Sequence, residues 1–392
     1  MTRVPITGIG IVAPGAVGVD AFRALLASGG TAVRQVERFD TTGLRAQAAA
    51  LVTEFVPKQF IAPMKMRRMN MLSRLAVSAA KMAIDDAGAA PEPNSGVAMG
   101  TSFGPVQTSI DYMQEYVEKG AALAPPQLFA ESVANAPGSH IAIEHNLRGF
   151  NVTVTQRESS ALAATMYAAT QIVKGTVRSA LVGGVEEVNE MIFSVLDRVG
   201  ALSVNGMRPF DARRDGLSIG EGSAVMVAGG EGAKRYGWLS GFGIARDVTA
   251  SVSDWGDDHE AVVAAMRAAI ADAELSVSDI DAIYSAANGT RRADRLELHA
   301  LSALFGAKVP PVVAVKGIFG EYSGGGSMQL AAALVAMDEQ TLHASYGFEQ
   351  PDPELRFEVT RERRPMPLRH ILINALSAGG GIVSAVISRE EQ

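Results

Sequence analysis

The stretch NVTVTQRESSALAATMYAATQIVKG, residues 151–175, predicts a strand, a tight turn and a helix in immediate succession. Residues 151–155 alternate apolar and polar side chains, residues 156–159 read as a turn, and residues 160–174 are an alanine-rich helix. Such an elbow presents its turn residue at a helix N-terminus, where backbone N–H groups and the helix dipole favour an anion. That residue is Glu158, whose carboxylate suits the place electrostatically. It is a poor acyl acceptor, because its product with a thioester would be an unstable anhydride.

The chain around this elbow has the pattern of an α/β protein. With 392 residues, 47% of them hydrophobic, it can bury a large core in one or two domains. Apolar strands alternate with helical stretches, which predicts buried sheets covered by helices. The expected strands are residues 4–11, 96–100, 151–155, 179–183 and 223–227 in a first series, and 237–243, 282–285, 311–315, 370–375 and 382–388 in a second. The clearest expected helices are residues 69–87, 160–174, 257–273, 294–305 and 327–340.

A polar, glycine-rich segment, GEGAKRYGW at residues 230–238, separates the two series. We therefore expect an N-terminal half at residues 1–235, which contains the elbow, and a C-terminal half at residues 236–392. Each half offers a strand, a charged turn and a helix, so the pattern is consistent with a structural duplication, although no sequence identity between the halves is visible.

Several functions are disfavoured by composition. The chain has no cysteine, which excludes disulfides, cysteine-ligated metals and thiol catalysis. A formal charge of -7 gives no electrostatic footprint for nucleic acid, and the six histidines have no metal-ligand spacing. No apolar run approaches the roughly 20 residues that span a bilayer. We expect a cytoplasmic protein with no cofactor, no metal, no nucleic-acid partner and no membrane association.

Five segments together resemble one family over essentially the whole chain. They are RVPITGIGIVAPGAVGVDAFRALLASG, ANAPGSHIAIEHNLRG, ALVGGVEEV, RPFDARRDGLSIGEGSAVMV and NALSAGGG. In order and spacing they are similar to the β-ketoacyl-acyl carrier protein synthases of the condensing-enzyme superfamily. The resemblance implies an α/β, thiolase-like, duplicated five-layer αβαβα fold, which dimerises through the strand that leads into the elbow.

The same resemblance implies that the family's Cys-His-His triad has been replaced. The elbow motif TACSSG is here TQRESSA, which places Glu158 at the cysteine. The HGTST motif corresponds to ANGTRRAD, with Asn288 at the first histidine. The KxxxGHxxGAAG motif corresponds to KGIFGEYSGGG, which retains Lys316 and places Glu321 at the second histidine. These four residues are the candidate vestigial site.

The loop that closes the family's site has changed as well. A GFGGTN-like loop carries a bulky gate residue and a glycine-rich backbone, and here SAGGGI places Ala378 at the Phe and Ile382 at the Asn. The resemblance implies that Ala378, Gly379, Gly380 and Ile382 are the candidate substrate-binding residues. The glycines are equally explained by tight turns and close packing.

The acids in this site invite two interpretations. Glu158 and Glu321 would place negative charge where negative charge develops during condensation, unless burial near a second carboxylate keeps one of them protonated. Arg157 or Lys316 could pair with either acid, which would give a structural ion network in a retired site. We favour this network over new acid-base chemistry.

The resemblance is to the branch that keeps the fold without the cysteine, the chain-length factors of polyketide systems, although their usual replacement is glutamine. It implies a non-condensing subunit that forms a heterodimer with a catalytic ketosynthase, receives acyl carrier protein and shapes the acyl tunnel. Residues 151–157 are the expected interface, and residues 101–113 the expected tunnel lining. Two alternatives remain: a cysteine-free enzyme that uses Glu158 and Glu321 on acyl thioesters, and a carrier-binding homodimer without turnover.

One further segment, MKMRRMN at residues 64–70, is basic. It fits an acidic carrier protein and a solvated helix start equally well. Its methionines and Met71 are expected to fill gaps in the core or to form an acyl-tunnel wall, and the core is favoured.

Overall fold

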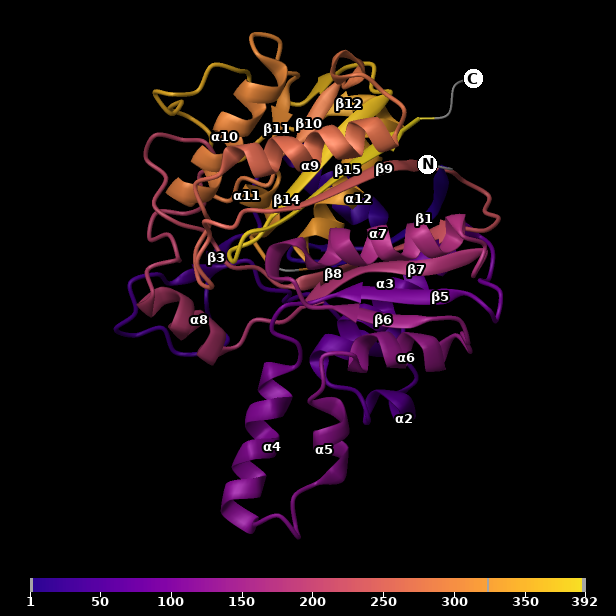
Figure 1. The fold of residues 1–392 in the computed structure, drawn as a ribbon. Coiled ribbons are helices and arrows are strands. Elements are labelled where there is room, and N and C mark those ends of the chain that lie inside the picture. The colour runs from indigo at the N-terminus through magenta and orange to yellow at the C-terminus, as the bar shows by residue number, and fades with distance from the viewer. Residues whose placement is uncertain (1–2, 323, 390–392) are drawn as a thin grey trace.

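The chain forms one hydrogen-bonded mixed sheet that runs through the whole molecule (Figure 1), in a computed structural model that describes residues 3–322 and 324–389. The sheet has eleven strands in the order β11-β10-β14-β15-β9-β1-β8-β7-β5-β6, with β2 beside β1. The strands of the first half are β1 (Val4–Ala13), β2 (Ala16–Val17), β5 (Gly96–Gly100), β6 (Asn151–Val154), β7 (Ser179–Glu186) and β8 (Gly222–Gly229). Those of the second half are β9 (Gly237–Arg246), β10 (Ala282–Tyr284), β11 (Val312–Val313), β14 (His370–Leu376) and β15 (Gly381–Ser388).

The two halves of the sheet have the same topology. Within the first half the order is β6-β5-β7-β8-β1, and within the second it is β11-β10-β14-β15-β9. In each half the first two of these pairings are parallel and the next two are antiparallel. Strands β1 and β9 then pair antiparallel and join the halves. This repeat confirms the predicted duplication, and the boundary between residues 235 and 236 stays a prediction.

Helices complete five layers. Helix α3 (Met71–Ala87) packs on the outer face of the first half, against β1 and β8. Helix α9 (His259–Asp272) packs on the outer face of the second half, with α10 (Arg291–Phe305) beside it. Helices α7 (Ser160–Val173) and α12 (Gly325–Glu339) lie between the two halves (Figure 1). Helix α12 is buried on almost all sides because alanine and aliphatic residues surround its axis. The predicted five-layer αβαβα fold is confirmed.

The duplication is also visible at single residues. Gly10 of β1 lies so close to α3 that a Cβ would be 1.9 Å from the carbonyl oxygen of Ala79. Gly243 of β9 lies in the same way on α9, where a Cβ would be 1.9 Å from the carbonyl oxygen of Ala265. Both glycines therefore serve the close approach of a helix to a strand.

A partly buried hydrogen bond repeats beside each of these glycines. The backbone N–H of Ile9 donates to Asp86 Oδ2 at 2.8 Å, and that of Phe242 donates to Asp272 Oδ2 at 3.0 Å. The segments TGIG at residues 7–10 and SGFG at residues 240–243 are thus equivalent. The expectation that no identity between the halves is visible was wrong for this short segment.

All ten expected strands and five expected helices are present, with ends that differ by a few residues. The sequence interpretation gave no bounds for α6 (Ala136–Glu144) and left out α1 (Val19–Ser28), α4 (Val106–Lys119), α5 (Pro126–Glu131) and α8 (Glu190–Arg198). The short elements are α2 (Pro63–Met66), α11 (Lys316–Phe319), β3 (Arg34–Gln35), β4 (Ala48–Ala49), β12 (Thr341–Leu342) and β13 (Arg364–Pro365), with 3-10 turns η1 (Pro57–Gln59), η2 (Arg157–Ser159) and η3 (Val277–Asp279).

Helices α4 and α5 form an arm that extends away from the body of the molecule (Figure 1). The rings of Tyr112 and Phe129 hold the two helices together, with centroids 5.6 Å apart. Several large apolar side chains of the arm are nevertheless exposed to solvent; they are Met113, Tyr116, Val117, Leu123 and Phe129. An apolar surface of this kind is typical of a protein contact.

The methionine cluster does not form core as a group. Met69 is buried and Met66 is half-buried, whereas Met64 and Met71 are exposed. The favoured core assignment was therefore wrong for Met64 and Met71, because the chain around α2 runs along the surface. Within the described ranges, no helix is long and apolar enough to cross a bilayer.

Candidate functional site

The predicted elbow is present and tightly held. Strand β6 ends at Val154, the turn η2 follows, and α7 begins at Ser160. The Ser160 hydroxyl accepts from the backbone N–H of Gln156 at 2.7 Å and donates to the carbonyl oxygen of Arg157 at 2.6 Å. Arg157 has a φ of 50°, a left-handed conformation that is uncommon for a residue other than glycine. The turn thus fixes the position of Glu158 at the start of α7.

Glu158 is hydrogen bonded to the loop that closes the site. Its Oε2 accepts from the backbone N–H of Ala378 at 3.1 Å. The adjacent Ser377 strengthens this connection, because its hydroxyl accepts from the N–H of Ser159 at 2.8 Å and donates to the carbonyl oxygen of Gln156 at 2.8 Å. Elbow and closing loop are therefore joined on both sides of Glu158. Ser377 was not among the predicted residues, and its place directly before Ala378 was the available signal.

Burial, together with the negative charge of Glu321, raises the pKa of Glu158 from 4.5 to about 7. The backbone N–H groups of Glu158 and Ala378 and the cation of Lys316 act in the opposite direction. At neutral pH the carboxyl group of Glu158 is therefore divided between its neutral and ionised forms.

Glu321 lies in a buried ion pair with Lys316. The Nζ of Lys316 donates to Glu321 Oε2 at 2.5 Å and to the carbonyl oxygen of Ala286 at 2.9 Å. Asn288 Nδ2 donates to the same Glu321 oxygen at 3.1 Å. The side chains of Lys316 and Glu321 are only 2% and 3% exposed. Glu321 Oε1 is buried and has no hydrogen-bond partner in the part of the chain that the structure describes.

These contacts decide between the ion pairs that the sequence left open. Arg157 and Lys316 were the two predicted partners of a buried acid, and it is Lys316 that pairs with Glu321. Arg157 is exposed and forms no ion pair with a described residue. The expectation that Arg157 could neutralise a buried acid was wrong. All four candidate vestigial residues belong to one site, since Glu321 and Lys316 also act electrostatically on Glu158.

Asn288 is positioned by an acid that the sequence interpretation did not single out. Asp294 Oδ1 accepts from the backbone N–H of Asn288 at 2.9 Å, and Asp294 Oδ2 accepts from that of Phe210 at 2.7 Å. Burial raises the pKa of Asp294 to about 6. Its signal in the sequence was an acidic residue in the first turn of a helix, which by itself indicates only helix stabilisation.

The closing loop contains the other four predicted residues, which differ in backbone conformation and in burial. Gly379 and Gly380 have φ values of 92° and 85°, which glycine adopts most readily, and the tight-turn explanation of these glycines holds. Ala378 is buried beside Glu158. Ile382 lies in β15 opposite Leu376 and is part of the core. Their predicted role in substrate binding stays a prediction.

A hollow of about 630 Å³ opens in front of the elbow and the closing loop. We call it the elbow hollow. Ala378 and Gly379 line it, whereas Gly380 and Ile382 do not belong to its lining. The remaining lining residues are Thr155, Gln156, Arg157, Ile244, Ala245, Arg246, Ala250, Ser251, Val252, Ser377 and Gly381.

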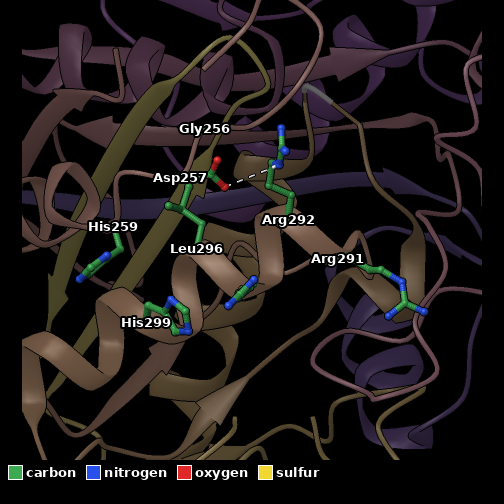
Figure 2. Close-up of a pocket in the computed structure, with 8 residues that line it drawn as sticks. Gly256, Asp257, His259, Arg291, Arg292, Leu296 and His299 are labelled. Atoms are coloured by element: carbon green, nitrogen blue, oxygen red, sulfur yellow. Dashed lines mark ion pairs between the residues drawn. The ribbon is translucent and has the colours of Figure 1, made fainter. Parts of the chain in front are cut away.

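A second hollow, of about 520 Å³, lies at the start of α10 (Figure 2). Figure 2 shows Arg292 directed toward Asp257, and Arg291 directed to the opposite side from His259. Arg292 is also paired with Asp254 at 2.7 Å. The His259 and His299 rings meet edge to face, with centroids 5.9 Å apart. Over residues 3–322 and 324–389, no three His, Asp or Glu side chains are placed to hold a metal ion.

Two buried glutamates fix the base of the arm. Glu186 Oε1 accepts from the hydroxyl of Thr101 at 2.9 Å, and its Oε2 accepts from the N–H of Ser102 at 2.7 Å. Glu187 Oε1 accepts from the N–H of Gln107 at 3.4 Å, close to the start of α4. Burial raises the pKa of each glutamate to about 7. The sequence did not identify these contacts, although both acids stand in the apolar segment ALVGGVEEV.

The chemistry available at this site differs from acyl transfer through a thiol. The elbow carries a carboxylate that is bonded to a backbone N–H, and the neighbouring cation is already neutralised by Glu321. Asn288 Nδ2 donates one of its two N–H groups to Glu321, and the second could donate to a carbonyl oxygen. Proton transfer is the reaction for which a carboxyl group with a pKa of about 7 is suited.

Both halves of the chain match models of one protein family. Residues 1–231 match the model of the β-ketoacyl synthase N-terminal domain, and residues 236–349 match that of the C-terminal domain. The putative polyketide beta-ketoacyl synthase 1 of Streptomyces cyaneus is 31% identical and aligns over 98% of this chain and 97% of its own length. The tetracenomycin polyketide synthase ketoacyl synthase beta subunit of Streptomyces glaucescens is 27% identical over 98% of each chain.

Among solved structures, that of the ishigamide ketosynthase/chain length factor superposes with a TM-score of 0.92 at 25% identity, over 99% of each chain. The sequence matches and this superposition extend over both halves of the molecule, including the elbow, the closing loop and the segments around Asn288 and Glu321. The chain therefore belongs to the β-ketoacyl synthase family.

Proposed function

We propose that this chain is a non-condensing, ketosynthase-like subunit that pairs with a catalytic ketosynthase and shapes the tunnel for the growing acyl chain. The observation that carries the proposal is the hydrogen bond from Ala378 N–H to the Glu158 carboxylate. A side chain that cannot accept an acyl group occupies the elbow, and it uses a backbone donor of the kind that stabilises an oxyanion in acyl transfer. Similarity to a ketoacyl synthase beta subunit and to a ketosynthase/chain length factor supports the same role.

Two surfaces are suited to a partner subunit. Among the described residues, strand β6 pairs with β5 alone, so its other edge has free backbone groups, in a segment that the resemblance assigns to the dimer contact. The arm of α4 and α5 exposes Val117, Leu123 and Phe129. Burying these side chains against a second subunit would be favourable, because each removes apolar area from water. The hydrogen bond from the N–H of Gln107 to Glu187 would couple movement of this arm to the proposed tunnel wall.

An acidic carrier protein would meet a basic surface near α2. Arg67 and Arg68 are exposed there, whereas Lys65 is paired with Glu144 at 2.9 Å. Two exposed arginines that form no ion pair with a described residue favour encounter with an acidic partner, mainly through the association rate. Charge reversal by Arg67→Glu and Arg68→Glu should weaken carrier binding without affecting assembly of the two subunits.

The decisive experiment measures product formation from malonyl- and acyl-carrier protein with the chain alone, with a cysteine-containing ketosynthase encoded beside it, and with both proteins. Product length is measured by mass spectrometry. The proposal predicts condensation only in the mixture. It also predicts that a bulkier residue in the arm base, such as Gln107→Trp, shortens the product, whereas the same substitution at the exposed Arg267 does not. Full product length from the ketosynthase alone would contradict it.

A second candidate function is acid-base catalysis on an acyl thioester, and the raised pKa of Glu158 is the observation that favours it. Decarboxylation or hydrolysis by the isolated chain, lost in Glu158→Gln or Glu321→Gln, would establish this alternative. Stable self-association with carrier binding, and no turnover in any mixture, would instead identify a carrier-binding homodimer.

A further inference from the structure

Both ends of the arm are held at the start of α3. At the α5 end, Asn70 donates from its side-chain Nδ2 to the carbonyl oxygen of Glu131 at 2.8 Å and from its backbone N–H to Glu131 Oε2 at 3.4 Å. At the α4 end, the backbone N–H of Gln107 donates to Glu187 Oε1 at 3.4 Å, and the N–H of Leu72 in α3 bonds to the same carboxylate. The first turn of α3 therefore contacts both points where the arm leaves the body.

Helix α6 contacts the α5 end of the arm from a second side (Figure 1). His140 Nε2 is hydrogen bonded to Glu131 Oε1 at 2.7 Å, and the two side chains are only 15% and 14% exposed. One turn later on α6, Glu144 is paired with Lys65 of α2 at 2.9 Å. Helix α6 thus contacts both the arm and the basic segment at residues 64–70.

The turn that carries Arg67 and Arg68 leads directly into the same contacts. The carbonyl oxygen of Met66 in this turn accepts from the guanidinium group of Arg74 in α3 at 3.1 Å. Asn70 follows the turn, and its Oδ1 caps α3 by accepting from a backbone N–H of the first helical turn at 2.7 Å. Asn70 therefore fixes the end of the basic turn, the start of α3 and the end of the arm at once.

The arm has little other support from the body. Among the described helices and strands, α4 and α5 pack chiefly on each other, and Thr108 is the buried residue of α4. The hydroxyl of Ser109 also joins the two helices at their base, since it donates to the carbonyl oxygen of Ser132 at 3.4 Å. A subunit that packs against the arm therefore acts on two ends that are both bonded to the start of α3.

We propose that Asn70 and Glu131 couple the two contacts of the proposed function, so that pairing with the ketosynthase raises the affinity of this chain for the carrier protein. This coupling rests on the proposed function and adds a regulation to it. Pairing fixes the arm with the Asn70–Glu131 contact formed, which orders the turn that carries Arg67 and Arg68. A carrier protein that binds an ordered turn loses less conformational entropy. By thermodynamic linkage, the carrier protein must raise the affinity for the ketosynthase by the same factor.

The test measures the affinity of this chain for the ketosynthase encoded beside it by analytical ultracentrifugation, with and without saturating acyl carrier protein. The carrier protein should tighten pairing by at least about fivefold. Glu131→Ala and Asn70→Ser should each lose most of this factor, because they remove the contact, while serine keeps an oxygen that can cap α3. The readout is the ratio of the two affinities, so a change in pairing itself cancels.

Hydrogen exchange gives a second readout that needs no carrier protein. Pairing with the ketosynthase should slow exchange of the backbone amides at residues 64–70, because the turn becomes ordered. In Asn70→Ser, pairing should leave the exchange of these amides unchanged.

The matched control is Glu92→Ala, because Glu92 forms an exposed ion pair with Arg178 at 3.2 Å and belongs neither to the arm nor to α3. It should keep the whole factor, and thermal unfolding should confirm that every variant is folded. Charge reversal by Arg67→Glu and Arg68→Glu removes the proposed carrier surface. Any tightening that remains in that variant comes from carrier protein bound to the ketosynthase itself and is subtracted.

Failure of the coupling and failure of the proposed function give different results. A chain that does not pair with the ketosynthase contradicts both. Normal pairing that the carrier protein leaves unchanged, or tightening that survives in both Glu131→Ala and Asn70→Ser, overturns the coupling alone. Unchanged exchange at residues 64–70 on pairing overturns it as well.

Discussion

The carboxylate of Glu158 accepts a hydrogen bond from the backbone N–H of Ala378, 220 residues further along the chain. This contact connects the elbow of the first half to the closing loop of the second. It leaves the elbow with neither a nucleophile nor a free backbone donor at Ala378. The loss of acyl-transfer chemistry is therefore a property of the folded site as well as of its residue types.

Replacing Glu158 by Gln should change how stability depends on pH. Burial raises the pKa of Glu158 from 4.5 to about 7, so between these values the folded state binds more protons than the unfolded state, and stability falls as pH rises. Glu158→Gln has no carboxyl group at this position, so it does not undergo this fall in stability. Its free energy of unfolding in urea should match the unmodified chain at pH 5 and exceed it by about 1–3 kcal/mol at pH 8. Glu186 and Glu187 add the same slope to both proteins, and a constant difference across this range would contradict the prediction.

Removing Lys316 should lower the free energy of unfolding, because the buried carboxylate of Glu321 loses its cation. Lys316→Met leaves Glu321 almost fully buried without a cation, which should cost about 3 kcal/mol at pH 8. The double variant Lys316→Met/Glu321→Gln should recover most of this loss. Lys65→Met is the control, because the exposed Lys65–Glu144 pair should contribute less than about 1 kcal/mol. Denaturant unfolding measures all three, and equal losses for Lys316→Met and Lys65→Met would refute the assignment.

The two equivalent glycines should respond alike to a methyl group. Gly10→Ala and Gly243→Ala each bring a Cβ to 1.9 Å from a helix carbonyl oxygen, so strand and helix must separate. Each should lower the free energy of unfolding by about 2–4 kcal/mol. Gly30→Ala meets only the flexible Ser28 hydroxyl and should be nearly neutral. A neutral result at only one of the two sites would show that the halves are not equivalent in packing.

A charge on the arm should prevent subunit pairing without unfolding the chain. Val117 is 76% exposed, so Val117→Glu should leave thermal stability unchanged and lower the affinity for the partner ketosynthase by at least tenfold. Val248→Glu is the control, since Val248 is 82% exposed but lies in the loop after β9. Co-purification and analytical ultracentrifugation measure the pairing. Normal assembly of Val117→Glu would remove the arm from the proposed interface.

The regular elements could be predicted because each has a local signal. The strands are short apolar runs between glycine-rich turns, and helices such as α3 and α7 are alanine-rich. The arm was missed although α4 places Ile110, Met113 and Val117 on one face at helical spacing. In the structure Thr108 is the buried residue of α4, and Met113 and Val117 are exposed, so this face does not pack on the core.

The sequence by itself determined that the chain has no thiol chemistry, that an acid stands at the elbow, and that the fold is a duplicated α/β one, because residue types and their local spacing are sufficient for each. Only the tertiary structure decided that Lys316 rather than Arg157 neutralises Glu321, and that Glu158 is bonded to Ala378. These contacts depend on how the two halves pack around α7 and α12. A side chain's partner and its pKa follow from burial and from neighbours far away in the chain, which local spacing does not encode.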